Sequence, residues 1–372
     1  MTLPPPARIG QSVDEVDTPA LLVDLDALEV NIAHMQSLAD AAGKALRPHA
    51  KSHKSADIAL RQIAAGAAGV CCQKVSEAEL LAQGGVTDIL VSNQVVGAAK
   101  IGRLARLARD CALAVCVDDA GNLAEIAAAA RRSGGIIEVL VELDVGMGRC
   151  GVGAEGVAAL ARQAAEEEGV RFGGLQAYNG RAQHIREHGK RAAAIADSQA
   201  IVADALEQLR AAGLDCPRVT GAGTGTFEFE AGGDVWTELQ CGSYVFMDAD
   251  YARNLDAEGE MLSRFRHSLF VLAGVMSVAQ AGRAVVDAGL KAMSMESGLP
   301  EVAGNDDLIY RGASDEHGTL ATGSSNGPAL GDRVRLIPGH CDPTVNLHDW
   351  YVCVRGGLVE EIWPVTARGA VF

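Results

Sequence analysis

Two lysines, Lys51 and Lys54 in the segment RPHAKSHKS, follow a short apolar run at residues 45–50. In an α/β protein, a residue at the carboxyl end of a strand commonly lies where the active site forms. A lysine there is either a solvated charge or a nucleophile that binds a carbonyl compound as an imine. Lys51 is the better candidate for the nucleophile because it directly follows the predicted strand, and Lys54 is its rival.

Two glycine-rich turns could bind a phosphate group. TGAGTGT (220–226) and QCGSY (240–244) each follow a strand-like run, and α/β barrels often build a phosphate site from the loops after their last strands. Glycine allows several backbone N–H groups to point at one anion. An ordinary loop is the alternative, because neither turn fits a P-loop or dinucleotide fingerprint. The candidate phosphate-binding residues are Gly223, Thr224, Gly225, Gly242, Ser243 and Tyr244.

A lysine that faces a phosphate site across a barrel mouth predicts pyridoxal phosphate (PLP), a cofactor held as an imine that accepts electrons. Arg149, in ELDVGMGRCGVG, either supports the phenolate oxygen of this cofactor or pairs with an acidic helix on the surface. His184, which follows Tyr178 in the chain, is either a base near the substrate or an exposed loop residue. His317 in SDEHG is equally ambiguous, and turn-rich positions slightly favour function for both histidines.

His340 and Asp342 in PGHCDPT are two residues apart at the end of a predicted strand. That spacing places both side chains on one face and Cys341 on the other. One imidazole with one carboxylate suits manganese or magnesium better than it suits a metal that prefers thiolates. The alternative is a structural pair joined by a hydrogen bond.

Repeated strand–helix units must position these residues. Eight apolar, strand-like runs alternate with alanine-rich helical patterns, which predicts a closed (β/α)8 barrel of the TIM type with its site at the carboxyl ends of the strands. The runs are ALRPHA (45–50), GVCCQ (69–73), DILVSN (88–93), LAVCVDD (113–119), EVLVELD (138–144), GGLQAYN (173–179), RVTGAG (218–223) and ELQCGSYV (238–245).

The two ends of the chain differ from this pattern. After about residue 262, strand-like runs are joined by turns without helices, which predicts a mostly antiparallel β domain. A surplus run, ALLVDL (20–25), precedes the barrel and could pair into that domain. The helix after it places Leu28, Ile32, Met35 and Leu38 on one side. The predicted boundaries are 26–260 for the barrel, and 1–25 with 261–372 for the β domain.

Composition limits the classes of partner. The 372 residues are 48% hydrophobic but only 4% aromatic, as expected for helices packed on parallel strands. The net charge of −16 and the lack of basic runs argue against nucleic acid as a partner. The nine cysteines form no CxxC pair and indicate a reducing compartment. Without a signal peptide or a membrane-spanning apolar run, a cytoplasmic protein is expected.

Taken together, these segments resemble fold-type III PLP enzymes with an alanine-racemase-like barrel, in the family of D-threonine aldolase, 3-hydroxy-D-aspartate aldolase and eukaryotic-type D-serine dehydratase. The resemblance covers essentially the whole chain. It is carried by DTPALLVDLDALEVNI, RPHAKSHKS, GVCCQKVSEAE, DVGMGRCGV (144–152), LQAYNG, TGAGTGT, ELQCGSYVFMDADY, VVDAGLKA, SDEHG and PGHCDPTVNLHDWY.

The resemblance implies that Lys51 is the Schiff-base lysine, that Arg149, Tyr178, Thr224, Gly225 and Tyr244 lie in cofactor-contacting motifs, and that His340 and Asp342 bind the metal. The dehydratases have Cys where this chain has Asp342 and use zinc, so Asp342 favours an aldolase with manganese, or alternatively magnesium. Asn179 stands where D-threonine aldolases often have His, which leaves the choice between threonine and hydroxyaspartate open. A homodimer is also expected from the resemblance.

The implied reaction is metal-assisted cleavage of a D-β-hydroxy amino acid to glycine and an aldehyde, with His184 or a metal-bound water as the base. D-Threonine is the first candidate substrate, and 3-hydroxy-D-aspartate, which would yield glyoxylate, is the second. The alternatives are a D-serine dehydratase and, from another class, a PLP-binding protein without catalytic activity.

Overall fold

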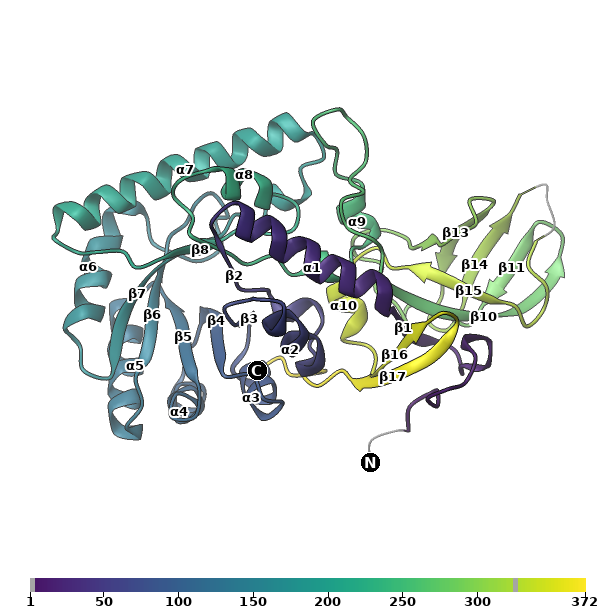
Figure 1. Ribbon diagram of the computed structural model, residues 1–372, viewed down its shortest axis with the longest axis horizontal. Helices are drawn as coiled ribbons and strands as arrows, with labels where there is room; N and C mark the ends of the chain where they lie inside the picture. Colours follow the sequence, from purple (N-terminus) through teal and green to yellow (C-terminus); the bar gives the residue numbers. More distant parts are fainter. Residues whose placement is uncertain (1–3, 324–326) are drawn as a thin grey trace.

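The chain folds into a barrel of parallel strands surrounded by helices, with a β domain beside it (Figure 1). The computed structural model describes residues 4–323 and 327–372. Each of the eight predicted barrel runs overlaps a strand, and these strands form one parallel sheet. They are β2 (Ala45–Leu46), β3 (Val70–Cys72), β4 (Asp88–Gln94), β5 (Ala112–Val117), β6 (Ile137–Glu142), β7 (Val170–Ala177), β8 (Val219–Gly221) and β9 (Glu238–Leu239).

The sheet closes on itself, which confirms the predicted barrel. Its order is β2, β9, β8, β7, β6, β5, β4, β3, so the first and the last barrel strands are neighbours. A parallel bridge between His49 and Cys71 joins the two ends of the sheet. Beyond the short strand β2, the N–H groups of Arg47 and His49 still donate to the carbonyls of Leu239 and Cys241, and the chain then turns into the 3-10 helix η2 (Ala50–Ser52).

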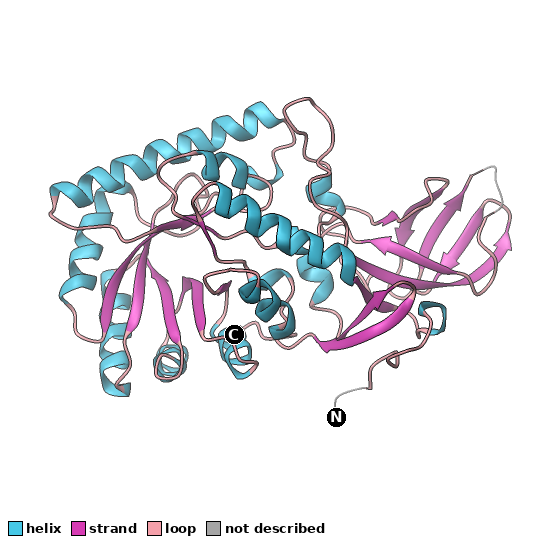
Figure 2. Cartoon of the chain, in the orientation of Figure 1, coloured by secondary structure: helices cyan, strands magenta, loops and turns pink. Residues whose placement is uncertain are grey.

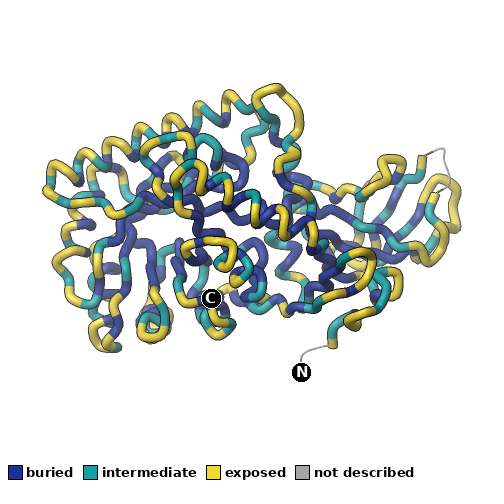
Figure 3. Tube along the Cα trace, viewed as in Figure 1, coloured by how far each residue is buried: buried dark blue, intermediate teal, exposed yellow. Residues whose placement is uncertain are grey.

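Helices cover the outside of the barrel (Figure 2), and their apolar faces pack against the strands. Helix α1 buries Leu28, Ile32 and Met35 as predicted, whereas Leu38 is only partly buried. Figure 3 shows the result, in which buried backbone fills the strands and exposed residues follow the outer helix faces. The helices are α1 (Leu25–Ala41), α2 (Ala56–Ala64), α3 (Val75–Gln83), α4 (Ala98–Leu107), α5 (Ala120–Ser133), α6 (Ala154–Glu166), α7 (His188–Ala211) and α8 (Phe227–Gly232).

A network of ion pairs closes the barrel at the amino ends of its strands. Arg47 Nε lies 3.0 Å from Glu238 Oε2, and Arg47 Nη1 lies 2.6 Å from Asp88 Oδ1. Arg218 pairs with Glu138 and lies 3.5 Å from Glu238. The side chains of Arg47 and Glu238 are each only 5% exposed, so their charges depend on each other for compensation.

The β domain is built from both ends of the chain. Strand β1 lies between β10, to which it is antiparallel, and β16, to which it is parallel, with Leu22 opposite Phe270 and Val352. This confirms that the surplus run at the N-terminus pairs into the β domain. The strands are β1 (Ala20–Asp24), β10 (Leu269–Gln280), β11 (Arg283–Val286), β12 (Glu301–Val302), β13 (Leu308–Ala313), β14 (Gly318–Thr322), β15 (Arg333–Ile337), β16 (Trp350–Arg355) and β17 (Leu358–Pro364).

Two short helices, α9 (Ala249–Ala252) and α10 (Cys341–Val345), lie where the barrel meets the β domain. The prediction that His340 and Asp342 end a strand is wrong. Strand β15 ends at Ile337, His340 is the N-cap of α10, and Asp342 lies in its first turn. The Pro338–Gly339 step ends the strand because proline lacks an N–H, and an acidic residue in the first turn favours a helix there.

Two features of the chain bear on its surroundings. In the two described ranges, no helix combines the length and apolarity needed to cross a membrane. All nine cysteines are free thiols; of these, Cys71, Cys72, Cys116, Cys241, Cys341 and Cys353 are buried.

The ion pairs at the amino ends of the barrel strands predict that two arginine substitutions lower the free energy of unfolding by unequal amounts. Replacing Arg47 with Met leaves the buried carboxylate of Glu238 under-compensated, so we expect a loss of roughly 3 kcal/mol in the free energy of unfolding, measured by urea denaturation. The control is Arg171→Met, because Arg171 is 66% exposed in its pair with Glu138. An exposed pair contributes at most about 1 kcal/mol. Equal losses in the two variants would contradict the assignment of Arg47 as a buried structural charge.

Candidate active site

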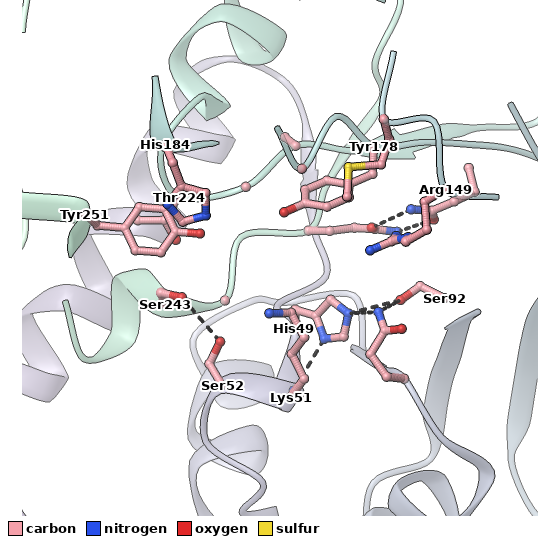
Figure 4. Close-up of a pocket in the computed structure, with 18 residues that line it drawn as sticks. His49, Lys51, Ser52, Ser92, Arg149, Tyr178, His184, Thr224, Ser243 and Tyr251 are labelled. Atoms are coloured by element: carbon pink, nitrogen blue, oxygen red, sulfur yellow. Dashed lines mark hydrogen bonds between the residues drawn. The ribbon is translucent and has the colours of Figure 1, made fainter. Parts of the chain in front are cut away.

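A cavity of about 410 Å³ opens at the carboxyl ends of the barrel strands. The loops after β2, β7, β8 and β9 contribute most of its walls, and α9 contributes Tyr251 (Figure 4). This is the end of the barrel at which TIM-type enzymes place their sites. Among the predicted residues, the cavity is lined by Lys51, Arg149, Tyr178, His184, Gly223, Thr224, Gly242 and Ser243.

Lys51 lies in η2, in the loop that follows strand β2, and its amine forms an ion pair with Asp342. Burial would lower the pKa of Lys51, but the charge of Asp342 outweighs burial and raises this pKa above its ordinary value. The rival, Lys54, is buried, and its Nζ lies 2.5 Å from Glu77 Oε1. Since Lys54 does not line the cavity, Lys51 is the candidate nucleophile.

His49 supports the lysine loop and escaped the predictions. Its Nδ1 accepts the backbone N–H of Lys51 at 3.3 Å, and its Nε2 lies 3.0 Å from Ser92 Oγ. Burial, together with the nearby charge of Lys51, lowers the pKa of His49 well below its ordinary value. The same Nε2 also lies 2.9 Å from Gln73 Nε2, so two polar side chains hold this edge of the ring. His49 therefore fixes the backbone that carries Lys51.

Four backbone N–H groups form an anion cradle on the cavity wall. They belong to Gly223 and Thr224 after β8 and to Gly242 and Ser243 after β9, and they have no hydrogen-bond acceptor in the part of the chain that the structure describes. Unpaired backbone donors are costly unless an anion or water satisfies them. This arrangement suits a phosphate group.

The side chain of Tyr244 and the N–H of Gly225 point away from this cradle. The hydroxyl of Tyr244 accepts a hydrogen bond from Gln62 at 3.0 Å inside the core, and its backbone N–H donates to Thr224 Oγ1. The N–H of Gly225 donates to Gln183 Oε1 at 3.0 Å. Neither residue lines the cavity, so both lie behind the cradle and support its shape.

Gln183 holds the cradle loop that follows β8 through side-chain hydrogen bonds. It is fully buried; its Nε2 donates to Thr226 Oγ1 at 2.8 Å, and Thr226 in turn donates to Glu230 Oε1 at 2.8 Å. A Cβ on Gly223 would stand 2.4 Å from Gln183 Oε1, which explains why a glycine is needed at this position. Nothing in the RAQHIR segment distinguished Gln183 from a surface glutamine.

The four remaining polar candidates lie in different surroundings. Arg149 lies exposed on the cavity wall, and Tyr178 lies half-buried beside it (Figure 4). Asn179 is buried, and its Nδ2 donates to Ser198 Oγ at 3.0 Å, so it has a structural role outside the cavity. His317 is exposed in the turn between β13 and β14 and does not line the cavity.

His340 and Asp342 converge beside Lys51, although they lie on a helix start rather than a strand. His340 Nε2 lies 3.8 Å from Asp342 Oδ1, a separation at which both atoms can bind one metal ion. Burial would lower the pKa of His340, but the hydrogen bond to Asp248 and the charge of Asp342 raise this pKa to about 9. Lys51 holds the pKa of Asp342 well below its ordinary range despite burial.

A different trio, Asp248, His340 and Cys341, has potential ligand atoms within 4.8 Å of one another. We favour the pair of His340 and Asp342, because Asp248 already accepts hydrogen bonds from His340 Nδ1 and from the N–H of Cys341. Burial also raises the pKa of the Cys341 thiol well above its ordinary value, so this sulfur remains protonated. A thiolate is the form that binds metals.

His184 lies on the opposite side of the cavity, close to Tyr251 (Figure 4). Its Nδ1 lies 2.6 Å from Asp250 Oδ2, and its ring centroid is 5.4 Å from that of Tyr251. Burial would raise the pKa of Asp250, but hydrogen bonds from His184 and Arg186 lower this pKa to about 2. The ionised carboxylate can only accept, so Nδ1 of His184 carries a proton and Nε2 is left for the cavity.

Comparison with known proteins gives the family. Residues 23–250 match the family described as "Alanine racemase, N-terminal domain", and residues 268–354 match "Putative serine dehydratase domain". A D-threonine aldolase from Arthrobacter sp is 49% identical over 99% of this chain and 97% of its own length. A 3-hydroxy-D-aspartate aldolase from Paracoccus denitrificans is also 49% identical, over 98% of this chain and 95% of its own. The chain belongs to this family of aldolases.

The crystal structure of a D-threonine aldolase from Filomicrobium marinum has the same fold as this family member, with a TM-score of 0.95, 48% identity, and coverage of 99% of this chain and 100% of the other. The aldolase family is PLP-dependent, with a fold-type III barrel. The cavity fits that cofactor, because Lys51 and the four residues whose N–H groups have no acceptor in the described chain line the same cavity. The His340–Asp342 pair fits a divalent metal with open positions for a substrate.

Glu230, which accepts the hydrogen bond of Thr226 behind the cradle, predicts that the stability of the protein depends on pH. Burial raises the pKa of Glu230 from 4.5 to about 7 in the folded protein. The folded state therefore binds a proton more tightly than the unfolded state, and the stability falls as the pH rises from about 4.5 to about 7. Glu230→Gln removes this ionisation, and we expect it to raise the free energy of unfolding by about 3 kcal/mol at pH 8, and by little at pH 4.5.

Urea denaturation at the two pH values tests this prediction. The control is Glu228→Gln on the same helix; Glu228 lies 2.9 Å from Arg264, so its loss is expected to lower stability at pH 8. A gain in E230Q of the same size at both pH values would show that the ionisation of Glu230 does not cause it.

Proposed function

We propose that this protein cleaves the Cα–Cβ bond of a D-configured β-hydroxy amino acid, D-threonine first among them, to glycine and an aldehyde. PLP and a divalent metal, manganese or alternatively magnesium, would serve as cofactors. The observation that carries the proposal is the contact between Lys51 and Asp342, which joins the candidate nucleophile to the candidate metal pair. A substrate bound through its amine would thus have its β-hydroxyl next to the metal.

The cofactors would supply the chemistry that amino acid side chains lack. PLP would accept the electron pair released when the Cα–Cβ bond breaks. The metal would act as a Lewis acid that makes the β-hydroxyl more acidic. Lys51 would hold PLP covalently, and His340 and Asp342 would bind the metal. The N–H groups of the cradle would bind the phosphate.

The remaining wall residues would handle charge and protons. Arg149 supplies a positive charge that suits the phenolate oxygen of the cofactor, and Tyr178 lies beside it. His184 would act as the base that accepts the β-hydroxyl proton on Nε2, since its Nδ1 is held by Asp250. The adjacent ring of Tyr251 limits the positions that the imidazole can adopt.

A specific observation favours a second substrate. A relative named 3-hydroxy-D-aspartate aldolase is as similar to this chain as the one named D-threonine aldolase, at 49% identity each. Asn179, which stands where D-threonine aldolases often have histidine, does not line the cavity and so does not separate the two substrates. Cleavage of 3-hydroxy-D-aspartate would give glycine and glyoxylate.

The setting of the protein is part of the proposal. Nine free cysteines support a reducing, cytoplasmic compartment. A homodimer is proposed from the family resemblance and would be tested by the solution mass of the purified protein.

The deciding experiment is an assay of the PLP-loaded protein with D-threonine and with D-3-hydroxyaspartate, each with manganese or magnesium and then with a chelator. We expect glycine to be released and its release to stop with the chelator, and the ratio of the two rates to identify the preferred substrate. Pyruvate or oxaloacetate without glycine would point to a dehydratase instead. A bound cofactor without turnover of either substrate would point to a PLP-binding protein without catalytic activity.

The role of Lys51 predicts the outcome of a matched pair of substitutions. Lys51→Ala removes the amine that would bind PLP, so we expect loss of the imine absorbance near the visible range and loss of glycine release. Lys54→Met removes the rival amine and its pair with Glu77, and we expect it to keep the imine absorbance while lowering stability. A Lys51→Ala protein that retained absorbance and turnover would disprove the assignment.

A further inference from the structure

The segment Asp248–Tyr251 holds two histidines of the site at the same time. Asp248 Oδ2 lies 2.7 Å from His340 Nδ1, and Asp250 Oδ2 lies 2.6 Å from His184 Nδ1. The two histidines come from different parts of the fold. His184 follows β7 in the barrel, and His340 precedes α10 in the β domain.

Asp248 is fixed by the backbone around it. It is fully buried and is the N-cap of α9, where its Oδ1 accepts the N–H of Tyr251 at 3.0 Å. Its Oδ2 accepts the N–H of Cys341, also at 3.0 Å. The N–H of Ala249 donates to the carbonyl of Pro338 at 3.1 Å, so the start of α9 is tied to the segment that leads to His340.

Asp250 is fixed by a guanidinium. Arg186 Nη2 pairs with Asp250 Oδ1, and Arg186 Nη1 donates to the backbone carbonyl of the same residue at 2.6 Å. The N–H of Asp250 donates to the carbonyl of Gly339 at 3.0 Å. The carboxylate therefore cannot rotate away from His184 without losing the contacts with Arg186.

Both carboxylates accept, so both imidazoles donate their Nδ1 proton and direct Nε2 elsewhere. Nε2 of His340 faces Asp342 Oδ1 at 3.8 Å, whereas His184 lines the cavity. The ring of Tyr251 contacts both, with its centroid 5.4 Å from that of His184 and 6.2 Å from that of His340. The same kind of hydrogen bond at Nδ1 therefore leaves Nε2 of each histidine free: that of His340 near Asp342, and that of His184 for the cavity.

We propose that Asp248 and Asp250 are positioning residues that assign the two histidines their separate roles: Asp248 orients His340 to bind the metal through Nε2, and Asp250 orients His184 to accept a proton through Nε2. The inference rests on the proposed function. Carboxylates that hold the second nitrogen of a metal-binding histidine commonly change metal affinity by about 10- to 100-fold when removed.

The experiment compares Asp248→Asn and Asp250→Asn in the PLP-loaded protein. For each we would measure the Kd for Mn²⁺ by calorimetric titration, then kcat and KM at saturating Mn²⁺. D248N is expected to raise the Kd about 10- to 100-fold, with activity recovering as Mn²⁺ is increased. D250N is expected to leave the Kd unchanged and to lower kcat about 100-fold or more without recovery, since an amide can donate to Nδ1 and impose the wrong tautomer.

Two further variants separate positioning from structure. Asp248→Ser keeps a hydroxyl that caps α9 but is too short to reach His340, so it is expected to weaken Mn²⁺ binding as D248N does, even where D248N fails to fold. The control, Asp197→Asn, changes an exposed residue of α7 and is expected to alter neither quantity.

Each outcome bears on the inference. Wild-type Mn²⁺ affinity in both D248N and D248S would overturn the role of Asp248, and an unchanged kcat in D250N would overturn that of Asp250. Equal loss of affinity and of kcat in D248N and D250N would show that the segment has only a structural role. If the wild-type protein cleaves neither substrate, the proposed function fails, while the Mn²⁺ titrations still decide the role of Asp248.

Discussion

Closure of the barrel is the constraint on which the site depends. Because the sheet closes with β2 next to β9, the lysine loop and the second cradle loop must lie side by side although they are far apart in sequence. The N–H of His49 donates to the carbonyl of Cys241, and Ser52 Oγ lies 3.5 Å from Ser243 Oγ. The ion pair of Arg47 and Glu238 holds the same seam at the opposite end of the strands. One strand pairing thus brings the amine and the anion cradle together.

The β domain supplies the half of the chemistry that the barrel lacks. His340 and Asp342 lie at the start of helix α10, beside Lys51. Asp248 and Asp250, at the start of α9, form hydrogen bonds with His340 and His184. Backbone strain occurs near the segments that form the site. The non-glycine residues with positive φ in the described ranges are Lys54, Ala222 and Met247, which adjoin the lysine loop, the cradle and Asp248 respectively. Strained backbone of this kind persists where the surrounding contacts over-determine it.

The sequence predicted most of what local chemistry decides. Apolar runs revealed every barrel strand, and glycine-rich turns revealed the cradle, since both signals are contained in a few consecutive residues. Residues whose role depends on distant partners were not predictable. His49, Gln183, Asp248 and Asp250 contact atoms contributed by other segments, such as Ser92 in the case of His49. A motif also does not show which way a side chain points: Tyr244 belongs to a predicted cofactor motif, but its side chain faces the core. The conformation at His340 was predicted wrongly, yet an N-cap and the first helical turn also bring the two side chains together.

Strand β1 has a consequence for how the protein is made. Its residues are synthesised before those of both its neighbours, β10 and β16, and all eight barrel strands lie between β1 and β10 in the sequence. Leu21, Leu22 and Val23 are completely buried in the finished sheet. On the ribosome these apolar residues have no partner strands until β10 and β16 have been synthesised, whereas the barrel strands emerge earlier and can pair among themselves. The barrel strands can therefore pair before the β domain is complete, and until then β1 has no partner strand on either edge.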